Sequence, residues 1–270
     1  MVFLLNLIYN SAAVRFCFRR DLASLFKLGG TVPVYGGYYY GFDYTYLVFI
    51  LPAIILSLWA QFKVKYTFKK YSKMKSSMNL SGASAANVVL NYNRVSGVNI
   101  KEIAGNLTDH FNPKDNSISL SEPVYADTSV SAVGVAAHEA GHAVQHANGY
   151  MPIKVRSFLV PVCNFGSFLS MPLILIGFIL PVKYIFCAYL GVALFSLAVL
   201  FHVVTLPVEL DASRRAIKAL EQSGTLYGEE LEGARKVLKA AAMTYVAGMI
   251  TSVLELLRLL FLLGSRKGRD

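Results

Sequence analysis

The stretch YIFCAYLGVALFSLAVLFHVVTL, residues 184–206, runs for 23 residues without an Asp, Glu, Lys or Arg. A helix rises about 1.5 Å per residue, and about 20 apolar residues are enough to cross a bilayer. Three further segments are long and apolar enough to be considered as spans: residues 46–62, 158–181 and 241–263. We therefore expect a mainly α-helical integral membrane protein with about four transmembrane helices.

The composition supports a membrane protein over an ordinary soluble domain. Hydrophobic residues make up 55% of the 270 residues and charged residues only 16%, against a usual charged share of about a quarter. The mean hydropathy is +0.48 and the net charge is +10. In a chain this apolar, the excess of Lys and Arg is typical of positively charged cytoplasmic flanks, and no soluble module interleaves basic with aromatic residues. Nucleic acid is therefore not an expected partner.

The basic residues that flank the apolar segments predict the orientation in the membrane. Only Lys183 lies in the short connection between residues 158–181 and 184–206, whereas the other flanks are heavily basic. These basic flanks all fall on one side, which should be the cytoplasmic side. They consist of Lys63, Lys65, Lys69, Lys70, Lys73, Lys75, Lys154, Arg156, Arg214, Arg215, Lys218, Arg235, Lys236 and Lys239.

The remaining segments define the expected organisation. Residues 63–157 form a cytoplasmic insert, and residues 207–240 form a second cytoplasmic segment with two helical patterns broken at Ser223-Gly224. Residues 1–45 are an N-terminal extension of unknown purpose, and residues 264–270 are a tail. Residues 158–206 hold the second and third transmembrane helices, residues 46–62 the first and residues 241–263 the fourth.

The insert contains local signals for helices and for a small β-hairpin. Residues 80–90 predict a short helix capped by Ser81 or Ser84, and residues 129–146 predict a second helix rich in Ala and Val. Between them, turn residues followed by the alternating SISLS, residues 117–121, predict one arm of a hairpin. We expect this insert to carry the chemistry.

Two features of the apolar segments need an interpretation. Glu255 and Arg258 lie three residues apart on one face of the fourth segment, where they should face the bundle interior or each other. The alternative is that this segment is a half-buried amphipathic helix. The three cysteines, Cys17, Cys163 and Cys187, are far apart and form no C-x-x-C pair, so we interpret them as small buried hydrophobic residues.

The second helix of the insert carries the motif His138-Glu139-Ala140-Gly141-His142, an H-E-x-x-H match. Four residues are just over one helical turn, so both imidazoles project from one face and can bind one zinc ion. Glu139 lies near the open position of such a metal and can take a proton from a water that the metal activates. The alternative is an amphipathic helix with scattered polar residues. The surrounding residues are almost entirely apolar, which would make these side chains costly to bury.

A catalytic zinc usually has three protein ligands, so a third must be found. His146 stands about 12 Å along the helix axis from His138, too far to share the ion, and is expected to be a polar neighbour or a residue at the rim that could contact substrate. Glu209 lies at the predicted cytoplasmic end of residues 184–206, at the same membrane surface as His142, which permits the two to meet. The alternative is that Glu209 begins a helix after Pro207 and complements the helix dipole.

Three other polar residues have open interpretations. Asp211 could orient a histidine from outside the ligand shell or replace Glu209 as the ligand. His202 lies seven residues before Glu209 and is expected to be a polar residue inside the bundle, unless Pro207 bends the chain. His110, beside Asp109, could contact substrate or the transition state, or could only organise the turn.

With these residues in hand, the chain resembles the YugP-like family of bacterial membrane neutral zinc metallopeptidases. The resemblance covers about residues 38–263 and rests on AQFKVKYTFKKYSK, LTDHFNP, ISLSEPVY, VGVAAHEAGHAVQHA, LVPVCNFGS, FSLAVLFHVVTLPVELDASRRAIKAL and EELEGARKVLKAAAMTYVA. The layout is similar to that of the HtpX and CAAX prenyl proteases, where a strand precedes the H-E-x-x-H helix. In that group a glutamate from a later helix completes the zinc site, and an aspartate typically follows it by four residues. Here that glutamate is Glu209, but the aspartate position holds Ser213 and the nearby acid is Asp211.

The resemblance implies a gluzincin-like zinc endopeptidase in the bacterial plasma membrane, with its site facing the cytoplasm. One Zn²⁺ per chain would be held by His138, His142 and Glu209, with Glu139 as general base. Polypeptides, including membrane proteins, would be the substrates, and SISLS could pair with an extended substrate. A non-catalytic zinc-binding scaffold or adaptor is the alternative, although a structural site is more often closed by a fourth Cys or His. A pore or transporter is disfavoured, because the second and third segments carry almost no paired charges.

Overall fold

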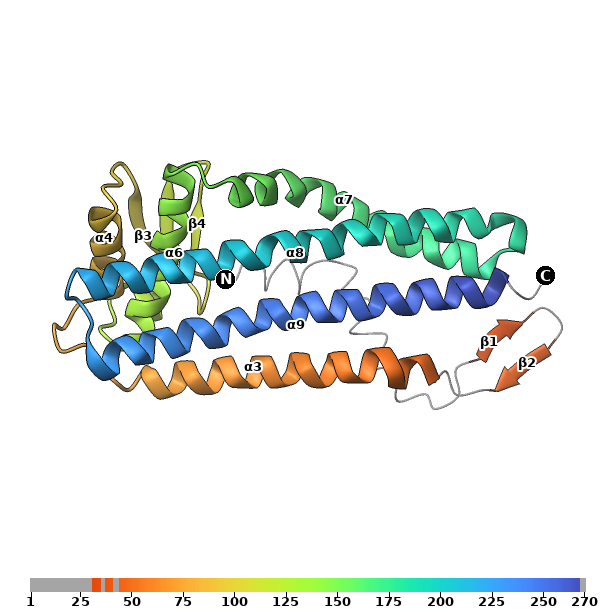
Figure 1. Ribbon diagram of the computed structural model, residues 1–270, viewed down its shortest axis with the longest axis horizontal. Coiled ribbons are helices and arrows are strands. Elements are labelled where there is room, and N and C mark those ends of the chain that lie inside the picture. Colours follow the sequence, from red (N-terminus) through yellow and green to blue (C-terminus); the bar gives the residue numbers. More distant parts are fainter. Residues whose placement is uncertain (1–30, 35–36, 41–43, 268–270) are drawn as a thin grey trace. The chain divides into compact units, whose positions relative to one another are not determined.

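The computed structural model describes residues 31–34, 37–40 and 44–267 (Figure 1). The predictions about residues 1–30, including Cys17, lie outside the described residues. The chain divides into two compact units. The first unit contains residues 58–157 and 204–246, and the second contains the described parts of residues 5–57, 158–203 and 247–270.

Four long apolar helices are candidate membrane spans by length and composition, which confirms the predicted fold class. They are α3 (Leu51–Tyr71), which continues the π-helical turn Tyr46–Ile50, α7 (Met151–Ile179), α8 (Ile185–Gln222) and α9 (Gly228–Lys267) (Figure 1). A short 3-10 turn, Val182–Tyr184, connects α7 to α8. Two strands, β1 (Thr31–Val34) and β2 (Gly37–Tyr40), form an antiparallel pair within the predicted N-terminal extension.

The second unit has the surface of a lipid-facing bundle. Large apolar side chains such as Phe158, Phe165 and Phe186 are exposed on its helices, an arrangement that water disfavours and hydrocarbon does not. The charges are turned inward: Arg258 Nη1 lies 3.2 Å from Glu255 Oε1, and both side chains are buried. The prediction that this pair faces the interior is therefore confirmed.

The two described cysteines are both free thiols. Cys163 is buried, and Cys187 is half-buried. The interpretation as small apolar side chains holds fully for the first and in part for the second.

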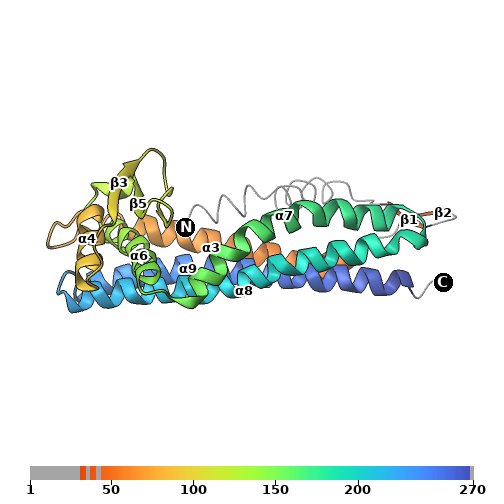
Figure 2. The same cartoon turned by 90° about the horizontal axis from the view of Figure 1, so that it is seen from above.

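The first unit is built around α6 (Val130–Ala147), whose residues from Val130 to Gln145 are all buried. A helix enclosed on every side has room only for small side chains, which explains its run of Ala, Val and Gly. Ser129 caps α6, and its hydroxyl accepts a hydrogen bond from Ala132 N at 3.3 Å. α4 (Gly82–Tyr92) packs against α6 and is capped by Ser81, one of the two caps that the sequence predicts (Figure 2).

A three-stranded sheet lies beside α6 in the same unit, with the strand order β3-β5-β4. β4 (His110–Asn112) and β5 (Ser117–Ser121) form the predicted antiparallel hairpin. β3 (Asn99–Ile103) runs parallel to β5 and was not predicted, because its sequence NIKEI is short and half polar. A one-turn helix, α5 (Glu122–Tyr125), leads from β5 towards α6.

The strand order corrects one expectation about substrate binding. SISLS is β5, the central strand, and β3 and β4 occupy both of its edges. All five of its residues are buried. β5 therefore has no edge left for a substrate, and the exposed edges of the sheet belong to β3 and β4.

The structure also excludes a helix start at Glu209. α8 runs without interruption from Ile185 to Gln222, with Pro207 in its interior. Proline is common in the first turn of helices, which is why a helix start after Pro207 was the alternative interpretation of Glu209. Because Glu209 lies in the middle of a 38-residue helix, it has no terminal N–H groups to cap. The predicted break at Ser223-Gly224 is confirmed, since α8 ends at Gln222 and α9 begins at Gly228.

Candidate metal centre

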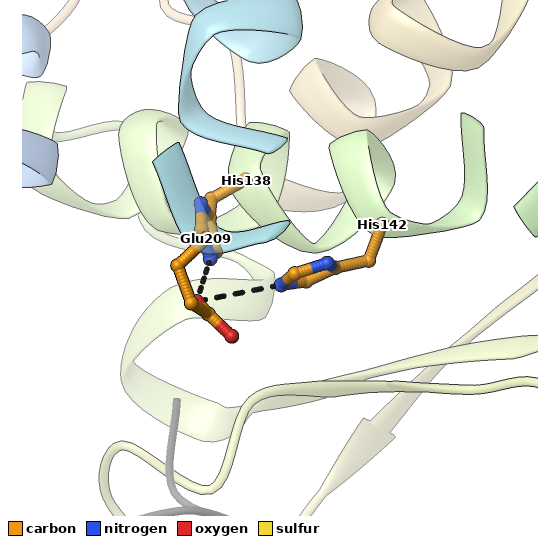
Figure 3. Close-up of side chains that lie close together, drawn as sticks. All are labelled: His138, His142 and Glu209. Atoms are coloured by element: carbon orange, nitrogen blue, oxygen red, sulfur yellow. Dashed lines mark ion pairs between the residues drawn. The ribbon is translucent and has the colours of Figure 1, made fainter. Parts of the chain in front are cut away.

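Three side chains from two helices converge in the first unit (Figure 3). His138 and His142 project from the same face of α6, and Glu209 projects towards them from α8. His138 Nε2 lies 3.3 Å and His142 Nε2 3.6 Å from Glu209 Oε2. All three side chains are buried, and their ligand atoms lie within 4.8 Å of one another. Within the described residues, this is the group of His and acidic side chains that could hold a metal ion.

The donor atoms fit a zinc ion in spacing and in chemistry. Zinc–ligand bonds of about 2.0–2.1 Å in a tetrahedron place neighbouring ligand atoms about 3.3 Å apart, close to the 3.3 and 3.6 Å between Glu209 Oε2 and the two imidazole nitrogens. Glu209 Oε2 is buried and makes no regular hydrogen bond. A buried carboxylate oxygen in that state is costly unless a cation or donor meets it. Two imidazoles and one carboxylate form a set that zinc readily accepts.

A glycine in the motif allows the two helices to meet. A Cβ atom placed on Gly141 would lie 2.4 Å from the carbonyl oxygen of Ala212 on α8, far inside van der Waals contact. Only glycine lets the α8 backbone lie against α6 at this point. The close approach brings Glu209, one turn before Ala212, within reach of the histidines.

The orientation of the His142 ring is set by Gln145, which sequence reasoning did not identify. Gln145 Nε2 donates to Val208 O at 2.8 Å and to Asp211 Oδ2 at 2.9 Å. Because both partners only accept, the amide oxygen must be the atom that faces His142 Nδ1, at 3.1 Å. His142 Nδ1 therefore carries the proton, and the lone pair of Nε2 points towards Glu209.

His138 has a different partner on the same side of its ring. Its Nδ1 hydrogen-bonds to the hydroxyl of Ser213 at 3.0 Å. Ser213 occupies the position where the broader HtpX-like group has an aspartate, so here a short hydroxyl makes the contact to the candidate ligand His138. The ring nitrogen that remains, Nε2, again faces Glu209.

Arg156 is a further residue of the site whose role the sequence did not reveal. The sequence marks it only as one of the basic flanking residues, but its Nη1 lies 3.1 Å from Glu209 Oε1. Burial raises the pKa of Glu209, but His142, His138 and Arg156 outweigh burial and hold this pKa well below its ordinary value. Glu209 is thus an anion at neutral pH, as a metal ligand must be.

Glu139 lies next to the group, buried on α6. The backbone N–H of Phe111, on β4, donates to Glu139 Oε2 at 3.1 Å and fixes that oxygen. A hollow beside Glu139 and His138 is otherwise apolar, lined by Val64, Phe68, Val135, Val237, Leu238 and Ala241. Electrostatic interactions are stronger in such surroundings than in water.

The structure places the other sequence-predicted residues around this group. Asp211 is not among the candidate ligands; it accepts hydrogen bonds from Gln145, Arg214 and Arg215, and so acts on His142 through Gln145. The hydrogen bonds outweigh the effect of burial, which raises the pKa of Asp211, and hold that pKa below its ordinary value.

The remaining histidines lie outside the candidate ligand group. His110 begins β4, and its Nδ1 lies 2.8 Å from Thr108 O, a contact that organises the turn. His146 is exposed and packs its ring against Phe111 at 5.7 Å between ring centroids. His202, in the second unit, donates from Nδ1 to Ala198 O at 2.8 Å within α8.

Two buried histidines from an H-E-x-x-H helix that meet a glutamate from a second helix, in a chain with four candidate spans, are typical of a membrane zinc metallopeptidase. The family model described as "Putative neutral zinc metallopeptidase" matches residues 46–264, so the chain belongs to this family. It is 43% identical over 225 residues to the Bacillus subtilis (strain 168) protein described as "Putative membrane protease YugP", covering 83% of this chain and 98% of that protein. The resemblance noted in the sequence is thereby confirmed. No solved structure matches the chain.

Proposed function

We propose that this protein is a membrane-embedded zinc-dependent endopeptidase that cleaves membrane or membrane-associated proteins at the cytoplasmic face. The observation that carries the proposal is the buried group of His138, His142 and Glu209 with Glu139 beside it. A purely structural site would not require a buried glutamate next to the ligands, whereas peptide hydrolysis requires a base there.

In this proposal each residue of the group has a defined role. His138, His142 and Glu209 hold one Zn²⁺ per chain, with Arg156 keeping the Glu209 carboxylate in place. Zinc supplies a Lewis acid that polarises the substrate carbonyl and lowers the pKa of water to about 7. Glu139 accepts the proton of the attacking water and passes it to the nitrogen of the leaving amine.

The substrate backbone is proposed to pair with β4. The backbone N–H of Phe111 donates to Glu139 and not to β5, so the edge of β4 that is not paired with β5 is turned towards the candidate centre. β4 is an edge strand, and an extended peptide can add to such an edge through main-chain hydrogen bonds. This arrangement would bring a scissile peptide bond alongside Glu139.

The cytoplasmic location is supported by the position of the basic residues. The lysines between residues 63 and 75 belong to the same compact unit as the candidate centre, as do Arg214, Arg215 and Lys218. Short basic flanks of apolar helices remain on the cytoplasmic side during insertion. A centre that belongs to this unit would act on the juxtamembrane segments of other membrane proteins.

The test compares wild type with Glu139→Gln, which preserves shape but removes the base. Zinc per chain is measured in the purified protein, and cleavage is measured on casein and on a membrane-protein substrate. We expect both proteins to hold one zinc and the variant to lose a factor of about 10²–10⁴ in cleavage rate. Glu122→Gln, which changes an exposed glutamate of α5, is the matched control. Equal cleavage by wild type and Glu139→Gln would refute the general-base role of Glu139, and zinc binding without cleavage by wild type would leave a zinc-binding scaffold.

A further inference from the structure

Asp109 is a buried carboxylate directly before β4 that the roles above do not use. It is 0% exposed. Its Oδ1 accepts hydrogen bonds from Ser121 N at 2.8 Å and from Ser121 Oγ at 3.0 Å, and its Oδ2 lies 3.1 Å from the same hydroxyl. Ser121 is the last residue of β5 and directly precedes α5. The side chain of Asp109 therefore ties the start of β4 to the end of the central strand.

These hydrogen bonds extend the β4–β5 ladder beyond its last backbone pair. The paired residues at the start of β4 are His110 and Ser119, and the next hydrogen-bonded pair of an antiparallel ladder would join Thr108 to Ser121. Thr108 O instead lies 2.8 Å from His110 Nδ1. Asp109 Oδ1 supplies the acceptor for the N–H of Ser121 in its place. Because β4 has only three residues, a clamp at its start restrains the whole strand.

The position of β4 matters for the proposed general base. Two residues after Asp109, the backbone N–H of Phe111 donates to Glu139 Oε2 at 3.1 Å. The last torsion of a glutamate side chain has a broad energy profile, so the side chain alone does not fix the plane of its carboxylate. The N–H of Phe111 fixes it for Glu139, provided that β4 stays in place. All of these residues belong to the first unit.

We propose that Asp109 is a positioning residue for the general base: it clamps β4 to β5, so that Phe111 N–H holds the Glu139 carboxylate in the orientation that proton transfer needs. This inference rests on the proposed peptidase function. Asp109 acts through the strand and not by contact with the substrate. A displacement of about 1 Å of a group that takes part in the reaction can lower its rate about 10²-fold. The effect should therefore fall mainly on kcat.

A clamp that only stabilises the sheet makes a different prediction. Its loss would lower the unfolding temperature, but the molecules that remain folded would cleave at the wild-type rate. The two roles are therefore separated by measuring kcat at a temperature where circular dichroism shows each variant to be folded.

The first experiment compares Asp109→Ala with Asp109→Asn in the full-length protein in detergent or vesicles. Asp109→Ala removes the acceptor for Ser121, and we expect one zinc per chain with kcat lower by about 10–10². Asp109→Asn keeps an oxygen for the N–H of Ser121 and should restore most of the lost rate. The matched control is Asp115→Ala, which removes an exposed aspartate that accepts from Ser117 Oγ at 2.7 Å, at the far end of the same hairpin. It should cleave as wild type does.

The second experiment removes the N–H that the clamp is proposed to hold. Phe111→Pro lacks this N–H, whereas Phe111→Ala keeps it, and both lose the ring that packs against His146. Proline is tolerated on an edge strand where its nitrogen does not join the ladder. We expect kcat of Phe111→Pro to be about 10–10² below that of Phe111→Ala. Adding Asp109→Ala to Phe111→Pro should change kcat by no more than about twofold, because both changes release the same carboxylate.

The outcomes separate this inference from the proposed function. If wild type cleaves and Glu139→Gln does not, two results overturn only the role of Asp109: wild-type kcat in folded Asp109→Ala, or fully additive losses in the double variant. Equal kcat for Phe111→Pro and Phe111→Ala would also overturn it. If wild type does not cleave, or if Glu139→Gln cleaves equally well, the proposed mechanism fails and the role of Asp109 fails with it.

Discussion

The hydrogen bonds of Gln145 predict how strongly a residue outside the ligand group controls metal binding. Gln145→Met keeps the length of the side chain but removes all of its hydrogen bonds, to His142 at 3.1 Å, Val208 at 2.8 Å and Asp211 at 2.9 Å. His142 would lose the acceptor that sets its tautomer. Losing such a partner lowers metal affinity by about 10–100-fold, which corresponds to about 1.4–2.7 kcal/mol of binding free energy.

The same variant should also lose stability, and the two effects can be separated. Gln145 is 0% exposed, and Val208 O and Asp211 Oδ2 would lose a buried donor. We expect the metal-free protein to unfold with a free energy lower by about 1–3 kcal/mol. Gln145→Glu should be more destabilising than Gln145→Met, because its carboxylate would face the Asp211 carboxylate without a donor.

The assay is zinc competition against a chromophoric chelator, at a temperature where the metal-free variant remains folded by circular dichroism. The matched control is Gln222→Met, which changes an exposed glutamine at the end of α8 that accepts a hydrogen bond from Tyr92. Its zinc affinity should equal that of wild type. If Gln145→Met also binds zinc within about twofold of wild type, the reasoning about the His142 tautomer is refuted.

Two further predictions test the helix contact and the third ligand. Gly141→Ala places a Cβ 2.4 Å from Ala212 O, so it should weaken zinc binding and destabilise the fold by about 1–3 kcal/mol. The control is Gly134→Ala, where the nearest atoms lie 3.6 Å from the added Cβ, and it should be neutral or stabilising by up to about 1 kcal/mol. Zinc titration and thermal unfolding measure both effects. Glu209→Ala should drop zinc content well below one per chain by metal analysis, while His146→Ala should retain it; the opposite pattern would show that Glu209 is not the ligand.

The local features of this protein are predictable from the sequence because they depend on residues that are neighbours along the chain. An uncharged run of 23 residues, 184–206, predicts a membrane helix from length and hydropathy alone. The four-residue spacing of His138 and His142 places both imidazoles on one face of any helix that contains them. The caps Ser81 and Ser129 follow the same logic, since a cap bonds to a backbone N–H only two or three residues away.

The features that depend on contacts between distant segments required the tertiary structure. The continuity of α8 through Pro207 was not predictable, because packing can override the local preference of proline to begin a helix. The short polar strand β3 leaves no strong pattern, and its pairing is what makes SISLS a central strand instead of an edge. Arg156 looked like a charge that orients the membrane helices, and only its distance to Glu209 shows that it serves the candidate centre.

Some residues of the candidate centre can therefore be predicted from the sequence, and the others are placed only by the tertiary structure. The motif alone predicts His138, Glu139 and His142, because helical periodicity is a property of one segment. The sequence left two interpretations of Glu209, a metal ligand or the start of a helix. The contact between α6 and α8 at Gly141 places its Oε2 atom 3.3 Å from His138 Nε2. Gln145 and Ser213 have no sequence signature, because a hydrogen bond between residues 66 or 75 positions apart depends on how the helices pack.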